Sequence, residues 1–132
     1  MTTPTKPRSN YARGRDLEHR VRNHLREQGY EVLRTAGSKS KVDLVALKSG
    51  QMLFVQCKRS GALPPAEWNG LWDLAQMVGA VPVLAEQLAR GRRYWRLTAR
   101  KDQPGKRQPM EELKLDELAG VQWPEREAVT RS

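Results

Sequence analysis

The sequence is poor in cysteine, in aromatic residues and in long apolar runs. Cys57 is the single cysteine among 132 residues, which excludes an intramolecular disulfide and disfavours a zinc site built on cysteines. No apolar run approaches the roughly 20 residues that a membrane helix needs, and residues 1–15 lack the apolar core of a signal peptide. We therefore expect a cytoplasmic protein, or one of the host cytoplasm if a phage encodes it, with no membrane partner and no small-molecule substrate.

Acidic residues are also few beside the basic ones. The chain has 24 Lys and Arg residues against 15 Asp and Glu residues, a formal net charge of +9. This excess favours a polyanionic partner, with nucleic acid first and an acidic membrane surface second. A soluble protein that is merely basic is the alternative that charge leaves open.

The spacing of apolar residues predicts one mixed α/β domain. Leu17, Val21 and Leu25 recur every four residues, as on one face of a helix, and Glu18 borders this stripe. Short apolar runs between Gly, Ser and Pro residues are typical of strands, and the length suits a single domain. We predict helices over residues 16–28 and from the Pro64-Pro65 pair to Gly79, and strands over residues 30–34, 42–47, 51–58, 81–85 and 93–98.

The two ends of the chain lack this periodicity. Residues 1–12 contain Pro, Thr and Lys without a helical or strand pattern, which predicts a flexible basic arm. Residues 13–99 form the predicted core. Residues 100–132 begin with a stretch rich in polar residues, Pro and Gly that is typical of a linker, and a short helix is predicted over residues 110–118.

The segment VDLVALKSGQMLFVQCK, residues 42–58, predicts a β-hairpin with polar groups gathered at its open end. Because side chains alternate between the two faces of a strand, Gln56 and Lys58 share one face, and Cys57 points to the other, toward the core. Asp43 begins the first strand, and the turn brings it beside the end of the second strand. Three polar side chains therefore converge at one edge of an apolar hairpin.

These groups suit phosphodiester chemistry assisted by a hard cation. Mg²⁺ prefers oxygen ligands, which the Asp43 carboxylate, the Gln56 amide and the backbone carbonyl of Cys57 can supply. A metal lowers the pKa of bound water and polarises a phosphoryl oxygen, and an adjacent lysine such as Lys58 orients the water or stabilises charge on the phosphate. A strand end that merely carries surface polar residues is the alternative interpretation.

Together with its flanking segments, the hairpin resembles the PD-(D/E)XK nuclease superfamily and, within it, the archaeal-type Holliday junction resolvases. The resemblance covers residues 11–98. It is more specific than the hairpin alone, because a helix acid, a Gly-Ser-Lys loop and the later strands occur in the same order. The matching segments are Arg13-Gly14 through Glu18, GYEVLRTAGSK at 29–39, KVDLVA at 41–46, FVQCK at 54–58, VPVLA at 81–85 and YWR at 94–96.

The resemblance implies a restriction-endonuclease-like core, a central mixed β-sheet flanked by helices, with a site for DNA hydrolysis. By position, the magnesium ligands of the family fall on Glu18, Asp43 and Gln56, and its catalytic lysine falls on Lys58. Mn²⁺ is expected to substitute for Mg²⁺. The implied DNA contacts come from the first helix, the first strand, the loop before the hairpin and the residue after it: Arg13, Arg15, Arg34, Ser38, Lys39, Ser40, Lys41 and Arg59.

The same resemblance implies an activity and an assembly. The expected protein is a homodimer that recognises branched DNA by its backbone path and nicks two opposed strands of a four-way (Holliday) junction. It would do so in recombination and repair or in phage DNA processing.

Gln56 departs from the family pattern, which has Glu or Asp at this position. An amide oxygen can coordinate a cation, but its neutrality removes one negative charge and is expected to weaken metal affinity. Two alternatives therefore stay open beside a working resolvase. One is another repair or restriction nuclease of the superfamily that acts on duplex or flap DNA, and the other is a junction-binding protein that Gln56 has left without catalysis.

Two clusters outside the hairpin have two interpretations each. Trp68 and Trp72 lie at helical spacing, which favours packing in the core over stacking on bases. Arg90, Arg92 and Arg93 lie beside Gly91, where contact with phosphate and a solvated turn are equally compatible with the sequence.

Overall fold

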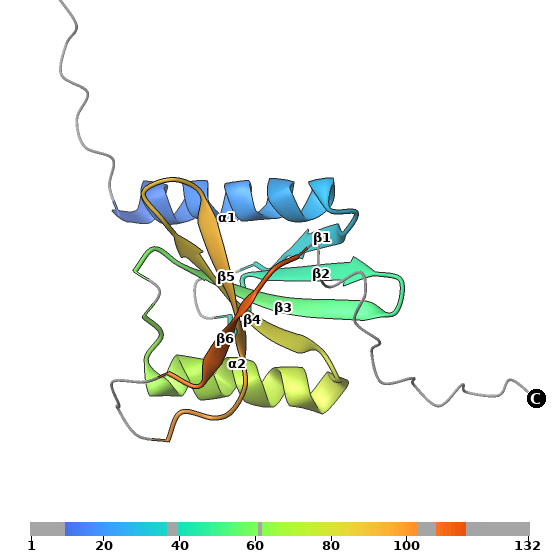
Figure 1. The fold of residues 1–132 in the computed structure, drawn as a ribbon, viewed down its shortest axis with the longest axis vertical. Helices are drawn as coiled ribbons and strands as arrows, with labels where there is room; N and C mark the ends of the chain where they lie inside the picture. The colour runs from blue at the N-terminus through green and yellow to red at the C-terminus, as the bar shows by residue number, and fades with distance from the viewer. Residues whose placement is uncertain (1–9, 37–39, 61, 103–107, 116–132) are drawn as a thin grey trace, which may run out of the picture.

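The computed structural model describes residues 10–36, 40–60, 62–102 and 108–115 (Figure 1). Within these ranges the strands form one six-stranded sheet in the order β1-β2-β3-β4-β5-β6. Neighbouring strands are antiparallel except β3 and β4, which run parallel, so the predicted α/β class with a central mixed sheet is confirmed. The elements are α1 (Asn10–Glu27), β1 (Glu31–Arg34), β2 (Leu44–Lys48), β3 (Gln51–Lys58), α2 (Pro65–Val78), β4 (Val81–Gln87), β5 (Arg92–Leu97) and β6 (Met110–Leu113).

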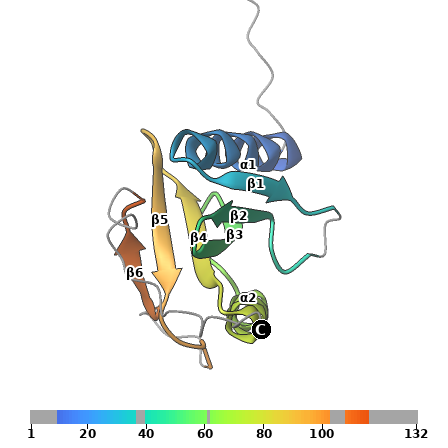
Figure 2. The ribbon, with the colours of Figure 1, turned by 90° about the vertical axis from the view of Figure 1, so that its right-hand side faces the viewer.

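The two helices cover opposite faces of the sheet, with α1 above and α2 below in Figures 1 and 2. On the α1 side, Leu17, Val21 and Leu25 are buried against the sheet, as their spacing predicts. On the α2 side, Trp68 is fully buried and Trp72 packs against the same cluster. The core interpretation of Trp68 is therefore confirmed, because a buried indole has no face available to a base.

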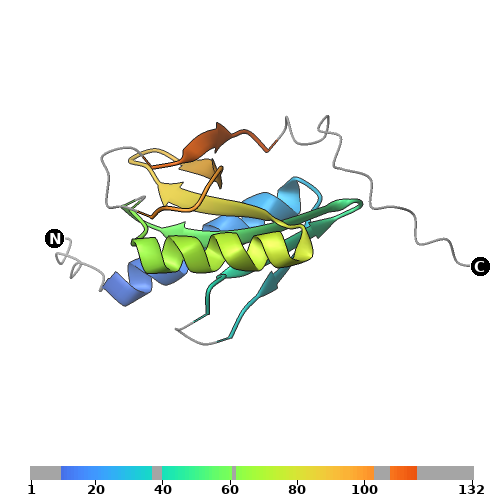
Figure 3. The ribbon, with the colours of Figure 1, turned by 90° about the horizontal axis from the view of Figure 1, so that it is seen from below.

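Helix α2 supplies the crossover that the parallel pair β3 and β4 requires. Seen from below, it runs across the face of the sheet (Figure 3). Pro64 adopts an extended conformation and precedes the first helical turn. The helix ends at Gly79, whose φ of +73° is favoured by glycine, and backbone N–H groups of this cap donate to the carbonyls of Ala75 and Gln76. Both predicted boundaries of the helix are thus confirmed.

The β2–β3 hairpin sets the position of the polar groups at its open end. Leu44 lies opposite Val55 and Lys48 lies opposite Gln51, so the turn is the two-residue Ser49-Gly50 and not residues 48–50, as the predicted strand bounds imply. Met52 and Phe54 face the α2-side cluster, whereas Leu53, Val55 and Cys57 face the α1-side cluster, as the predicted alternation requires. This register leaves Asp43 directly before β2 and beside the last residues of β3.

The C-terminal extension differs from the prediction. Residues 110–113 form strand β6, antiparallel to β5, where the sequence predicted a helix over residues 110–118. Met110 packs against the α2-side cluster and Leu113 against the α1-side cluster, so the side chains alternate across the sheet with the period of a strand. Pairing with β5 decides the conformation, and the sheet extends beyond the core predicted to end at residue 99. The last three residues of the predicted helix lie outside the described ranges.

The N-terminal helix is also longer than predicted. It begins at Asn10, inside the segment predicted as a flexible arm, and not at Asp16. Residues 1–9 of that arm lie outside the described ranges.

Candidate active site

The open end of the hairpin holds the carboxylate of Asp43 in place. The Asp43 N–H donates to the Val55 carbonyl at 2.9 Å, and the Cys57 N–H donates to Oδ2 of Asp43 at 2.8 Å. Burial raises the pKa of Asp43, and the negative charge of Glu18 raises it further, whereas the hydrogen bond from Cys57 and the charge of Lys58 lower it. A half-buried carboxylate with a carboxylate neighbour is stabilised in its ionised form by a bound cation.

The loop before β2 fixes the backbone of this aspartate. The Thr35 N–H donates to the Asp43 carbonyl at 3.1 Å, and the Thr35 hydroxyl lies within hydrogen-bond distance of the carbonyls of Val42 and Asp43. The Ser40 hydroxyl also donates to the Val42 carbonyl, at 2.7 Å. Sequence reasoning did not assign Thr35 a role; the signal was a hydroxyl residue directly after a strand and eight residues before the aspartate.

Helix α1 brings Glu18 to the same end of the hairpin. The charge of Glu18 acts on Asp43, and Nε of Arg34, the last residue of β1, lies 3.4 Å from Oε1 of Glu18. The Glu18 side chain is 23 % exposed, consistent with its predicted place at the border of the buried helix stripe. Arg34 is therefore the ion-pair partner of a candidate metal ligand, with about half of its side chain still exposed.

Gln56 is the one buried polar residue of the described core, at 8 % exposure. Its Oε1 atom is buried and has no hydrogen-bond partner. A buried amide oxygen without a donor costs free energy on folding, and a cation at this oxygen would remove that cost. The donor set of Glu18, Asp43 and Gln56 thus fits a hard metal ion such as Mg²⁺, which takes carboxylate and amide oxygens.

Lys58 has a partner that sequence reasoning missed. Its Nζ lies 3.4 Å from Oε2 of Glu67, which stands in the first turn of α2. The charge of Glu67 also acts on Asp43 and raises the pKa of that carboxyl, so Glu67 faces the same corner of the molecule. An acid at the start of a helix that directly follows the Gln-x-Lys strand was the available signal.

We call the group of Glu18, Asp43, Gln56, Lys58 and Glu67 the acidic corner. Across the part of the chain that the structure describes, no three His, Cys, Asp or Glu side chains are grouped as a metal site. The two carboxylates of Glu18 and Asp43 are complemented by the amide of Gln56 and not by a third acid.

Comparison with known proteins identifies the family. A model of the archaeal Holliday junction resolvases (Hjc) matches residues 9–118. The chain belongs to the archaeal Holliday junction resolvase family.

Two proteins of this family are similar to the chain. The crossover junction endodeoxyribonuclease Hjc of Methanocaldococcus jannaschii is 32 % identical over 82 residues, a match that covers 59 % of this chain and 61 % of the relative. The chain thus matches less than two thirds of that relative's length. Hjc of Archaeoglobus fulgidus, a Holliday junction resolvase of known structure, has a TM-score of 0.61 at 22 % identity, covering 85 % of this chain and 99 % of its own. This likeness confirms the resolvase fold.

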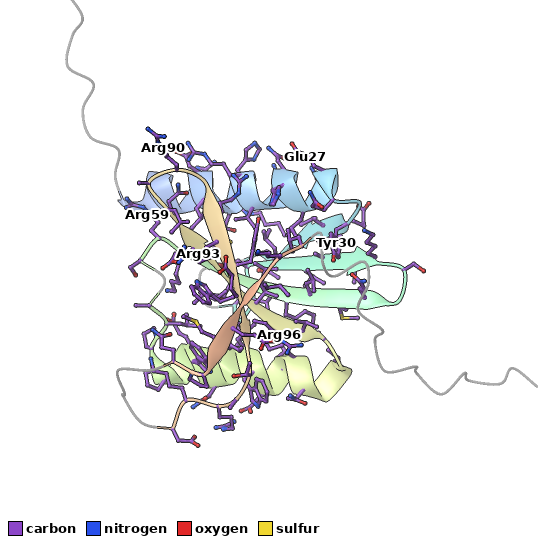
Figure 4. The ribbon with its side chains drawn as sticks, in the orientation of Figure 1. Glu27, Tyr30, Arg59, Arg90, Arg93 and Arg96 are labelled. Atoms are coloured by element: carbon purple, nitrogen blue, oxygen red, sulfur yellow. The ribbon has the colours of Figure 1, made fainter. Side chains whose placement is uncertain are left out.

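The structure describes only some of the residues that the resolvase resemblance assigns to DNA contact. Arg15, Lys41 and Arg59 are exposed, and Arg59 follows β3 on the left of Figure 4. Ser40 instead uses its hydroxyl within the loop. The remaining candidates, Ser38, Lys39 and the side chain of Arg13, lie outside what the structure describes.

No helix in the described ranges is long and apolar enough to cross a membrane.

Proposed function

We propose that this protein is a metal-dependent endodeoxyribonuclease that resolves four-way DNA junctions by paired nicks. The observation that carries the proposal is the acidic corner. The charges of Glu18 and Lys58 both act on Asp43 at the end of the hairpin, in a chain of the resolvase family. Both relatives are named for the same activity. The net charge of +9 suits a DNA substrate.

The metal ligands of the proposed enzyme are Glu18, Asp43 and Gln56, with the backbone carbonyl of Cys57 as a further oxygen. Mg²⁺ is the proposed ion and Mn²⁺ the proposed substitute, because both accept oxygen ligands. When bound, such an ion supplies a water of lowered pKa and neutralises charge on the phosphoryl group. The unpartnered Oε1 of Gln56 supports this assignment, because it is a buried acceptor that lacks a donor.

The other residues of the acidic corner position charge around the scissile phosphate. Glu67 holds the ammonium group of Lys58 close to Asp43, where that group stabilises negative charge that develops on the phosphate. Arg34 balances the charge of Glu18. Thr35 holds the Asp43 backbone through its amide and hydroxyl, so that the carboxylate keeps its place at the end of the strand.

Pairs of nicks require two sites, so we propose that the protein is a homodimer. We also propose that it acts in the cytoplasm. A four-way junction has two equivalent scissile positions, which a two-fold symmetric protein matches with two identical sites. Met77 is 75 % exposed and Val78 39 % exposed at the end of α2. Exposed apolar side chains of this kind are suited to contact with a second subunit.

The test compares a labelled synthetic four-way junction with a linear duplex of the same sequence. We expect symmetric nicks in the junction with Mg²⁺ or Mn²⁺, none with EDTA, and an intact duplex. Equal cleavage of duplex or flap DNA would instead support a repair or restriction nuclease. Tight junction binding without cleavage in either metal would support the second candidate, a binding protein, which the neutral Gln56 favours.

A further inference from the structure

A second polar region lies between the C-terminal half of α1 and the strands β5 and β6. It is a cavity of about 340 Å³ whose lining includes His24, Gln28, Arg92, Tyr94 and Lys114. None of these residues belongs to the acidic corner. The volume is in the range of sites that hold a small ligand or a single nucleotide unit.

Two cations of the lining have no acidic partner. No carboxylate within the described ranges pairs with Arg92 or Lys114, and Nε of Arg92 is a buried donor without an acceptor. Arg93 differs, because its Nε lies 3.8 Å from Oε1 of Glu112 and its guanidinium lies over the ring of Trp95. The lining therefore holds more positive than negative charge, and no described carboxylate pairs with Arg92 or Lys114, although Arg92 forms a side-chain hydrogen bond with Tyr94.

The lining also contains a neutral hydrogen-bonding pair, His24 and Tyr94. Nδ1 of His24 lies 2.7 Å from the Tyr94 hydroxyl, and the two rings are stacked. Burial and the charge of Arg92 lower the pKa of His24, although Glu27 opposes them, and burial raises the pKa of Tyr94 to about 12. Both rings are thus uncharged near neutral pH.

We propose that this cavity is a phosphate-binding subsite, with Arg92 and Lys114 as the binding cations and His24 as a hydrogen-bonding wall. Arginine and lysine side chains are the usual partners of phosphate, and a guanidinium can contact two of its oxygens. A neutral ligand would leave both cations uncompensated. The proposed occupant is a backbone phosphate of the DNA substrate, and a free phosphate group is the other source of the same chemistry.

The location of the cavity connects it to the acidic corner. Lys58 pairs with Glu86, and Glu86 pairs with Arg93, so β5 begins at the end of the sheet where β3 ends. Two strand spacings separate Lys58 from Arg93, about 10 Å. In Figure 4, Arg59 after β3 and Arg90 in the β4–β5 turn lie on the same side. A DNA backbone at the acidic corner therefore reaches the cavity within a few nucleotides. The DNA assignment rests on the proposed function.

The first experiment uses inorganic phosphate and no DNA. Phosphate added to the wild-type protein should shift the NMR signals of the His24 ring and of Arg92, with saturation in the millimolar range. The substitution Arg92→Gln should raise the apparent Kd by at least about tenfold, as expected when a charged hydrogen-bonding partner is removed. Arg90→Gln is the matched control, because Arg90 does not line the cavity, and it should leave the shifts unchanged.

The second experiment measures junction binding of the full chain against salt concentration. Arg92→Gln and Lys114→Gln should each weaken binding severalfold and reduce the steepness of the log–log salt dependence by about one, the value for a single phosphate neutralised by a cation. Arg90→Gln should weaken binding less than either. Thermal unfolding of each variant tests whether it is folded, and Lys114→Gln alters an exposed side chain only.

Each outcome decides the proposal. Saturable phosphate shifts together with reduced DNA affinity of the variants support the subsite. Absence of phosphate shifts at the cavity overturns it. Phosphate shifts with unchanged junction affinity in the variants overturn the DNA assignment, and so does an equal reduction of affinity in Arg90→Gln. If the wild-type protein does not bind junctions at all, the proposed function fails, and the phosphate titration alone still decides whether the cavity binds this group.

Discussion

The acidic corner and the cavity beside Arg92 are opposite in charge and lie at the same end of one sheet. Helix α1 contributes to both, with Glu18 at the acidic corner and His24 at the cavity. In the acidic corner a buried acceptor, Oε1 of Gln56, lacks a donor, and at the cavity a buried donor, Nε of Arg92, lacks an acceptor. The first region therefore suits a cation and the second an anion.

This difference shows how a protein with a net charge of +9 can accommodate the proposed cation site. Three carboxylates, those of Glu18, Asp43 and Glu67, gather at the end of the hairpin, where Arg34 pairs with Glu18 and Lys58 with Glu67 and offset part of this charge. The uncompensated positive charge lies elsewhere, including Arg92 and Lys114. A nuclease needs both arrangements, because its metal and its substrate phosphates carry opposite charges.

The largest expected effect separates catalysis from binding. Asp43→Asn removes a carboxylate of the acidic corner and leaves every cation in place, so junction cleavage should fall by at least about a thousandfold while junction affinity is retained. Single-turnover cleavage and a binding titration measure the two quantities. Asp102→Asn, at an exposed carboxylate that pairs with Arg100, is the control and should cleave normally. Cleavage by Asp43→Asn at the wild-type rate would remove Asp43 from the site.

A smaller reduction is expected for the lysine of the acidic corner. Lys58→Ala should slow cleavage about a hundredfold, the scale of a positioned electrostatic or proton-transfer group. Lys48→Ala, at the turn of the same hairpin, removes the same charge at the other end of the strands. If both variants show the same reduction in activity, charge near the hairpin matters and the position of Lys58 does not.

Substitution of Glu67 should lower the cleavage rate by roughly tenfold or less, because its ion pair with Lys58 is half exposed and such pairs are weak. Glu67→Gln is expected to lower kcat and leave KM unchanged. Adding Gln56→Glu to this variant should restore part of the rate, because the double variant gives Lys58 a new carboxylate neighbour. Asp73→Asn is the matched control, because it removes another acid of α2, one that pairs with Arg100. Full activity of Glu67→Gln would show that Lys58 acts without its ion pair to Glu67.

The smallest shift concerns the metal requirement. Gln56→Glu restores the charge that the family pattern has at this position, so the Mg²⁺ concentration for half-maximal cleavage should fall severalfold, and Gln56→Ala should raise it. Mn²⁺ binding measured by calorimetry without DNA provides a reading that is independent of activity. Identical midpoints for Gln, Glu and Ala would mean that position 56 does not touch the metal.

Local features of the sequence were sufficient for the hairpin and its polar end. The alternation of side chains in residues 51–58 and a turn at Ser49-Gly50 both act within one short segment, so they place Gln56, Lys58 and Asp43 together without knowledge of the rest of the chain, although the turn is one residue shorter than predicted. The apolar stripe of α1 and the Gly79 cap of α2 are local in the same sense. These predictions therefore agree with the structure.

Tertiary structure decided what depends on partners distant in sequence. The segment 110–113 is a strand because β5 offers it an open edge, and its own pattern is equally compatible with a helix. Glu67 meets Lys58 across the connection from β3 to α2, and His24 meets Tyr94 seventy residues later. Packing of one element against another fixes such contacts, and no spacing within either segment encodes them. The hairpin residues of the acidic corner, Asp43, Gln56 and Lys58, were thus predictable locally, whereas the contacts of Glu67 and the cavity beside Arg92 exist only in the folded chain.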